Sequence, residues 1–171
     1  MIRQYVLARS DGAARVNLPE SSKSASLRSI EIVGEDGEPA TEIPGQNPFR
    51  IRALYTVHSP LPGLQLDLAV NNHLGQRLFT ARYTGAGPDA TAQPGNYEAE
   101  LSIPGDLLVP GEYSFDTTFH QPYVKYHDIQ QHVISVRILA TSPHAHWMGK
   151  DPGSLFITLP FTSRPSASLP E

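Results

Sequence analysis

The sequence predicts an all-β chain, folded as an antiparallel β-sandwich of about eight strands. Three observations lead to this fold class. First, the 171 residues include 13 glycines and 16 prolines. Together they make up about a sixth of the chain, against roughly 12% in average usage, and helix interiors tolerate neither residue. Second, apolar and polar residues alternate over most of the chain. Third, no segment between these alternating runs has helical periodicity, which favours a sandwich over an α/β fold.

The strands are expected where apolar residues recur at every second position, which turns one side of a strand toward a core. The clearest case is Phe49–Val57, where Phe49, Ile51, Ala53, Tyr55 and Val57 share one side. Glycine- and asparagine-rich turns follow the first and third runs, at residues 34–37 and 71–75. The eight predicted runs are 27–33, 49–57, 64–70, 77–83, 97–103, 113–119, 134–138 and 155–159.

Two segments flank the predicted sandwich. Residues 2–9 have apolar side chains at helical spacing and predict one short helix, followed by a serine- and glycine-rich linker. The last ten residues contain prolines and serines and predict a flexible tail. The predicted organisation is therefore helix and linker over 1–26, sandwich over 27–161 and tail over 162–171.

Composition and motifs argue against several function classes. The net charge of −4 and the lack of basic runs argue against nucleic-acid binding. No apolar run reaches the ~18 residues of a membrane span, and the amino-terminal residues lack the apolar core of an export signal. The chain has no cysteine, which fits a reducing compartment and excludes thiolate chemistry. No phosphate-binding loop and no Gly-x-Ser-x-Gly motif occurs, so neither an enzyme nor a cofactor is expected.

The seven histidines leave one metal hypothesis open. His144 and His146 would lie on one side of an extended backbone, and His127, His132 or Asp128 could supply a third ligand for a divalent metal. The alternative is that these are loop histidines beside prolines, solvated or hydrogen-bonded to the backbone. That alternative is favoured, because pairs of histidines at such spacing arise easily by chance.

Aromatic and hydrogen-bonding side chains are concentrated in residues 120–128, between two predicted strands. His120, Tyr123 and Tyr126 belong to this segment, and Trp147 lies in a later loop. Such mixtures suit sugars, whose C–H faces stack on aromatic rings while their hydroxyl groups bond to polar side chains. The alternative is that the rings fix their loops onto the sandwich. Further polar candidates lie on the strands themselves: Arg52, Asp67, Asn71 and Asp116.

One segment indicates a particular protein family more specifically than the composition does. Ile103-Pro104-Gly105-Asp106 ends one predicted strand, and Pro110-Gly111-Glu112-Tyr113 opens the next. The segments 72–76, 95–97, 30–37 and 44–51 precede it in a fixed order of turns and strands. This order resembles the C-terminal carbohydrate-binding domain of the ATP-binding subunit of O-antigen polysaccharide ABC exporters, the Wzt-type domain. The resemblance covers roughly residues 27–160.

The resemblance implies an immunoglobulin-like sandwich that binds the finished polysaccharide at its capped non-reducing end, in the cytoplasm. It implies an exporter ATPase domain and a membrane subunit as partners, at the cytoplasmic face of the inner membrane. It also implies a homodimer formed by exchange of a C-terminal strand, here residues 153–160, with residues 141–152 as the hinge. The ligand contacts of the family vary with the glycan, so no individual residue is assigned from the resemblance.

The sequence therefore predicts a non-catalytic carbohydrate-binding domain with no resident metal. Aromatic contact is expected from Tyr123, Tyr126 or Trp147. Hydrogen bonds are expected from Arg52, Asp67, Asn71, Asp116 and His120. Two alternatives remain: a protein-interaction sandwich that docks a partner through an edge strand, and the metal-dependent enzyme.

Overall fold

The chain is all-β over the residues that the computed structural model describes, 12–83, 87, 90–141, 153, 155 and 157. No helix occurs within these residues. The short helix expected over residues 2–9 and the tail expected over 162–171 lie outside them. The strands are β1 (Arg15–Asn17), β2 (Ala25–Val33), β3 (Glu42–Pro44), β4 (Phe49–Val57), β5 (Leu61–Pro62), β6 (Gln65–Asn72), β7 (Arg77–Tyr83), β8 (Thr91–Ala92), β9 (Gly95–Ile103), β10 (Gly111–Gln121) and β11 (Lys125–Leu139).

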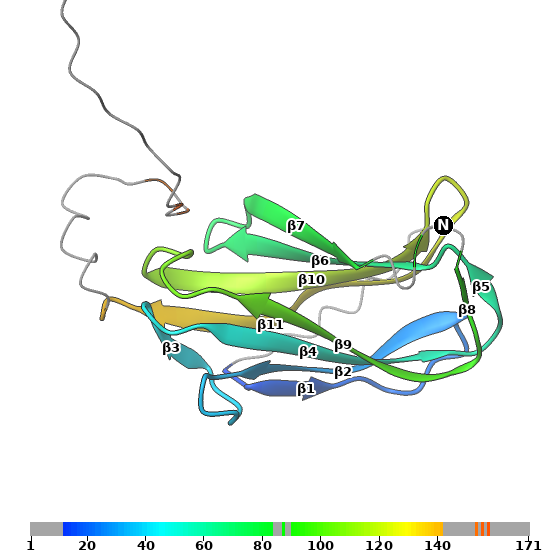
Figure 1. Ribbon diagram of the computed structural model, residues 1–171, viewed down its shortest axis with the longest axis horizontal. Coiled ribbons are helices and arrows are strands. Elements are labelled where there is room, and N and C mark those ends of the chain that lie inside the picture. The colour runs from blue at the N-terminus through cyan, green and yellow to red at the C-terminus, as the bar shows by residue number, and fades with distance from the viewer. Residues whose placement is uncertain are drawn as a thin grey trace, which may run out of the picture.

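Two main sheets form two layers, one over the other (Figure 1). The four-stranded sheet has the order β1-β2-β4-β9, and the five-stranded sheet has the order β3-β11-β10-β6-β7. Neighbouring strands are antiparallel except β3, which pairs with β11 in parallel. Strands β5 and β8 form a separate two-stranded ribbon.

Side chains from both sheets form one apolar core between the layers. On β4, burial alternates without exception, and the five residues predicted to face the core are all buried. The opposite layer supplies Leu68 and Val70 from β6 and Phe115 and Phe119 from β10. Each large apolar side chain buried in this way contributes about 1.5–3 kcal/mol, so the strand alternation explains why the layers associate.

A buried carboxylate also links the two sheets. Asp128 lies on β11, yet its Oδ2 accepts a hydrogen bond of 3.0 Å from the backbone N–H of Leu27 on β2. Its Oδ1 receives Nζ of Lys23 at 2.5 Å and Nε2 of Gln130 at 2.9 Å. The bond from Leu27 lies where β2 changes register against β4, between Leu27 and Ser29. Asp128 thus satisfies a backbone donor next to this irregularity and fixes one layer to the other.

The short strands β3, β5 and β8 were not predicted, and two further segments differ from the expected pattern. Arg15–Asn17 lies in the predicted linker but forms β1, which pairs with β2 through backbone bonds that need no apolar alternation. β11 begins at Lys125, so most of the aromatic segment 120–128 belongs to a hairpin rather than to a loop. Polar residues on both sides of β11 hide its alternation, because His127 and Asp128 are buried although polar.

The sequence Pro-Gly-x-Tyr occurs at the start of two strands with the same local structure. The hydroxyl of Tyr113 donates to the carbonyl of Val109 at 2.7 Å, and the hydroxyl of Tyr97 donates to the carbonyl of Gln93 at 2.6 Å. Each tyrosine therefore closes onto the connection that precedes its own strand. A tyrosine that bonds back to the upstream backbone in this way is a feature of immunoglobulin-like sandwiches.

No helix within the described ranges is long and apolar enough to cross a membrane.

Candidate functional site

The outer face of the five-stranded sheet carries five of the residues predicted to bind a ligand. Asp67 and Asn71 come from β6, Asp116 and His120 from the neighbouring β10, and Tyr126 from β11. The pairings Asp67 with Thr118 and Asn71 with Ser114 align these strands. Because alternate residues of paired strands share one side of a sheet, side chains far apart in sequence meet on this face, which points away from the core.

Three of these side chains, together with Arg82 of β7, form one group at the end of the sheet near the β10–β11 hairpin. Arg82 of β7 binds Asp67 through both oxygens, with Nε–Oδ1 at 2.7 Å and Nη2–Oδ2 at 2.8 Å. Nε2 of His120 lies 3.2 Å from Oδ2 of Asp67. The ring of Tyr126 stacks on the ring of His120, with centroids 5.6 Å apart and planes at 25°. We call Asp67, Arg82, His120 and Tyr126 the corner cluster.

The charges of the corner cluster compensate each other. Hydrogen bonding from Arg82 is the main reason that the pKa of Asp67 lies below its usual value, and His120 lowers it further. The same bond to Asp67 raises the pKa of the Arg82 guanidinium, to which Tyr123 contributes electrostatically. A two-pronged arginine–carboxylate pair is geometrically well defined. The cluster therefore presents fixed donors and acceptors, and the exposed Tyr126 ring, 62% accessible, lies beside them.

The β10–β11 hairpin rises from the end of the five-stranded sheet, away from the four-stranded sheet (Figure 1). At its tip the N–H of Val124 donates to the carbonyl of Gln121 at 3.0 Å, and Tyr123 adopts a φ of 61°. A left-handed conformation is uncommon for a bulky residue and costs about 1–3 kcal/mol. Tyr123 is fully exposed, at 110%. The turn therefore holds an aromatic ring in solvent on a strained backbone, which is a feature of functional positions.

The base of the hairpin is fixed by polar bonds. Nε2 of Gln121 donates to the carbonyl of Pro62 at 2.7 Å, and its Oε1 lies 3.0 Å from Nε2 of His127. Burial lowers the pKa of His127, and Lys125 and His120 lower it further. A neutral ring Nε2–H therefore donates to Gln121, and His127 supports the hairpin that carries Tyr123.

A second polar group lies farther along the same face. β11 bulges here: Phe115 pairs with Ile134 and Thr117 with Gln130, so three residues of β11 oppose one of β10. His132 lies in the bulge with a φ of 49°, and its backbone N–H donates to Oδ1 of Asp116 at 2.8 Å. Nη2 of Arg77 binds Oδ2 of Asp116 at 3.0 Å. Nδ1 of His132 lies 2.8 Å from Oγ of Ser114.

These groups do not form a catalytic triad. The Asp116 carboxylate binds the backbone N–H of His132 and not a nitrogen of its ring, so it cannot orient the imidazole as a general base for Ser114. With Asn71, which pairs with Ser114 across the strands, we call Asn71, Arg77, Ser114, Asp116 and His132 the bulge cluster.

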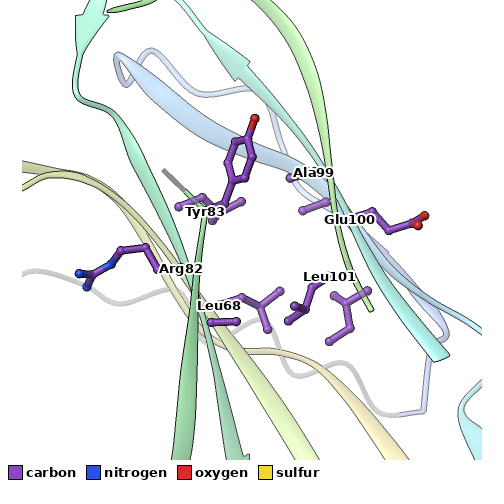
Figure 2. A pocket seen from close by; sticks show the side chains of 10 residues that line it. Leu68, Arg82, Tyr83, Ala99, Glu100 and Leu101 are labelled. Atoms are coloured by element: carbon purple, nitrogen blue, oxygen red, sulfur yellow. The ribbon is translucent and has the colours of Figure 1, made fainter. Parts of the chain in front are cut away.

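An apolar hollow lies elsewhere, where the edge strands β7 and β9 leave the layers open. It measures about 150 Å³. Leu68 and Leu101 lie at its floor, Tyr83 stands at its rim, and Arg82 and Glu100 point away from it (Figure 2). Its lining is Ile51, Ala53, Leu66, Leu68, Ala81, Arg82, Tyr83, Ala99, Glu100 and Leu101. We call it the edge cleft.

Comparison with known proteins agrees with this architecture. The profile of the Wzt C-terminal domain family matches residues 20–149. The chain belongs to that family. A comparison with curated proteins finds no match.

Solved structures include a similar fold within the family. The crystal structure of the C-terminal domain of Wzt aligns with a TM-score of 0.65 and 12% identity, covering 92% of each chain. At that identity the likeness shows the fold alone. A CARDB domain from Pyrococcus furiosus, in complex with di-metal ions, aligns with a TM-score of 0.38 and 10% identity, over 70% of this chain and 97% of the other. That likeness supports no conclusion.

Arg52 of this Wzt C-terminal domain lies apart from the other predicted ligands. It is on β4, and its guanidinium binds Oε1 of Glu31 at 2.9 Å and pairs with Glu98 and Glu100 at 3.4 and 3.5 Å. Desolvation lowers the pKa of Arg52, but the three carboxylates together raise it above its usual value. Arg52 therefore belongs to a charge ladder on the outer face of the four-stranded sheet. Trp147 lies outside the described residues.

The histidines considered for a metal site do not all lie in one place within the described residues. His144 and His146 lie outside the described residues. His127 and Asp128 are buried in the structural roles given above, and His132 belongs to the bulge cluster. Among the residues that the structure describes, no group of three or more histidines and carboxylates could hold a metal ion.

Three members of the two clusters were not identified from the sequence, Arg77, Arg82 and Ser114, and His132 was considered only as a metal ligand. Arg82 could have been found, because the turn at 71–75 sets β6 and β7 in register and places Arg82 opposite Asp67. Ser114 lies two residues before Asp116 and therefore shares its side of the strand. The place of His132 beside Ser114 could not have been predicted, because the bulge that creates it has no sequence signal of its own.

Proposed function

We propose that this Wzt C-terminal domain is a non-catalytic carbohydrate-binding domain. It recognises the capped non-reducing end of an O-antigen polysaccharide for export by an ABC transporter. The observation that carries the proposal is the corner cluster, where an exposed Tyr126 ring stacks on His120 beside the two-pronged Asp67–Arg82 pair. Family membership supports the export context.

The chemistry of the corner cluster suits a sugar. The free face of Tyr126 offers an apolar platform for the C–H groups of a pyranose ring. Asp67 and Arg82 hold each other in place, so their remaining lone pairs and N–H groups can bind hydroxyl groups without much loss of side-chain entropy. Tyr123, on the hairpin above, is a further candidate for stacking, and Trp147 remains a prediction.

The affinity of one such site is expected to be modest. Each sugar hydroxyl exchanges a bond to water for a bond to protein, with a net gain of only about 0.5–1.5 kcal/mol. Two linked sites would bind more tightly through avidity if both reached one polysaccharide or neighbouring ones. This argument favours the homodimer that the resemblance implies, formed by exchange of residues 153–160. Of that segment, Leu155 forms a bridge with Leu108.

The cellular setting follows from the export role. The partners would be the exporter's ATPase domain and membrane subunit, at the cytoplasmic face of the inner membrane. The two layers with a shared core and the tyrosine at the start of β10 support an immunoglobulin-like sandwich as the scaffold.

The test is a calorimetric titration of the domain with O-antigen polysaccharide from the strain that encodes it, with and without its terminal cap. Binding that requires the cap is expected, and Tyr126→Ala should weaken it about tenfold by removing the platform. Tyr83→Ala is the matched control, because Tyr83 is a similarly exposed aromatic in the edge cleft. Absence of binding by the folded wild-type domain would contradict the proposal.

The edge cleft supports a second candidate function, a protein-interaction domain that docks a partner by strand addition. β7 and β9 each pair with one strand only in the described part of the chain, so their outer edges are unpaired. An unpaired edge beside an apolar cleft is suited to an added strand. In that case Tyr83→Ala, and not Tyr126→Ala, would abolish binding to the partner.

A further inference from the structure

We propose that the bulge cluster is a second sugar-binding subsite, so that the sheet face binds a stretch of consecutive sugar residues and not the terminal residue alone. The inference rests on the proposed function and extends it to the length of glycan that is recognised.

The two clusters form one continuous surface. Asp67 and Asn71 lie on the same side of β6, four residues apart, which at ~3.3 Å per residue places them ~13 Å from each other. The position between them on β6 is Ala69, which pairs with Thr80 on β7 and with Asp116 on β10. Ala69 and Thr80 have small side chains, and Asp116 already belongs to the bulge cluster, so the two clusters adjoin on this face. A glycan that contacts Tyr126 can therefore continue along β6 and β10.

The backbone of the bulge cluster is strained and is held in place by specific interactions. The φ of 49° at His132 costs about 1–3 kcal/mol. Two interactions hold this conformation: the bond from the His132 N–H to Asp116, and the pair of Asp116 with Arg77. The effect is to present the exposed imidazole beside the Ser114 hydroxyl. A regular β11 would satisfy its backbone without this strain.

One buried group in the bulge cluster lacks a partner. Asn71 is only 3% exposed, and its Nδ2 has no hydrogen-bond acceptor among the described residues. Leaving a buried donor unsatisfied costs about 1–3 kcal/mol. Asn71 lies between Ser114 on β10 and Arg77 on β7 in the strand register. A ligand oxygen seated between those two neighbours would supply the missing acceptor.

The charge of the bulge cluster selects the chemical class of ligand. Arg77 and Asp116 neutralise each other, which leaves an amide, a hydroxyl and an imidazole as the groups free to bind. These groups both donate and accept hydrogen bonds without a net charge. They suit the hydroxyl groups of a neutral sugar better than a phosphate or a metal ion.

The experiment compares two probes: whole O-antigen polysaccharide from the encoding strain, and the shortest fragment from mild acid hydrolysis that keeps the capped end. Ser114→Ala and His132→Asn are expected to weaken the whole polysaccharide about tenfold and to leave the fragment unchanged. His132→Asn keeps the backbone bond to Asp116, and asparagine tolerates a left-handed conformation. Tyr126→Ala should weaken both probes. Ser102→Ala, on the four-stranded sheet, is the matched control.

The two proposals fail in different ways. If the wild-type domain binds neither probe, the proposed function is wrong. If Tyr126→Ala weakens binding but Ser114→Ala and His132→Asn bind whole polysaccharide as tightly as wild type, only the second subsite is wrong. Equal weakening of both probes by the bulge variants would also overturn it. Should a variant unfold, the NMR signal of the His132 ring in the wild-type domain decides, because it must shift with polysaccharide and stay unchanged with the fragment.

Discussion

Individual polar side chains on the five-stranded sheet hold one another in place before any ligand arrives. Asp67 accepts from both prongs of Arg82 and contacts His120. Asp116 receives the Arg77 guanidinium and a backbone N–H. In both clusters a carboxylate is neutralised by an arginine from β7, so β7 fixes the binding groups of its neighbours. This arrangement keeps the surface polar without a strong net charge.

The Asp67–Arg82 pair makes a prediction at this scale. Arg82→Ala is expected to raise the pKa of Asp67 toward its usual value, because the main cause that lowers it is removed. Carbon-13 NMR titration of the Asp67 carboxyl measures the shift. Because the native pKa is depressed, the stabilisation by this pair is present above the unfolded pKa of Asp67 and is lost as the pH falls through its native pKa. Arg137→Ala, which removes an ion pair with Glu112, is the control and should leave the pKa of Asp67 unchanged.

Elements, in turn, decide where those side chains meet. β4 was predictable to the residue, because strict alternation and burial on one side coincide. The hairpin formed by β10 and β11 was not, since its polar residues have structural tasks that composition does not reveal. His127 supports the turn, and Asp128 holds β2. The site has the same limit. Strand alternation predicts which residues of β6 and β10 point outward, but it does not predict the bulge at His132.

Asp128 is expected to be the most costly polar residue to remove. Asp128→Ala leaves the N–H of Leu27 without its acceptor and Lys23 without its ion pair, and a loss of about 3–5 kcal/mol in unfolding free energy is expected. Asp128→Asn should lose less, because it retains an acceptor for Leu27. Urea unfolding measures both variants, with Glu112→Ala as an exposed carboxylate control. Equal stability of Asp128→Ala and wild type would contradict a role in joining the sheets.

The connection between β9 and β10 makes a second prediction at the element scale. A Cβ on Gly105 would lie 2.1 Å from the carbonyl oxygen of Gln46, and the next N–H, of Asp106, donates to the carbonyl of Gly45 at 2.8 Å. Gly105→Ala must therefore push two backbone segments apart, at a cost of at least about 1–3 kcal/mol. Gly37→Ala meets no atom within 4 Å and bears only the strain of a φ of 85°, about 1 kcal/mol. Thermal unfolding should rank Gly105→Ala as the less stable variant.

The whole molecule closes its core more completely on one side than on the other. Inward-facing residues of β4 are buried, whereas Tyr97, Ala99 and Leu101 of the edge strand β9 are only partly buried. The aromatic group at this end packs across the layers: the Tyr55 ring lies 5.3 Å from Tyr97 and 4.9 Å from Phe119. Tyr55 therefore joins both sheets near the edge cleft, and its ionisation should report on the integrity of the whole core.

Burial is the main cause that raises the pKa of Tyr55 to about 12, with smaller contributions from Tyr83 and Tyr97. Because the native pKa lies above the unfolded value of about 10, the stabilisation is fully present below pH 10 and is lost as the pH rises toward 12. Two units correspond to about 2.7 kcal/mol. Unfolding free energy measured in urea between pH 9 and 12 should therefore fall in the wild-type protein and fall less in Tyr55→Phe. Tyr123→Phe is the matched control. The Tyr123 side chain is fully exposed, so removing its hydroxyl should leave the alkaline loss of stability unchanged. A Tyr55→Phe variant that lost stability as steeply as wild type would show that another group causes the alkaline loss of stability.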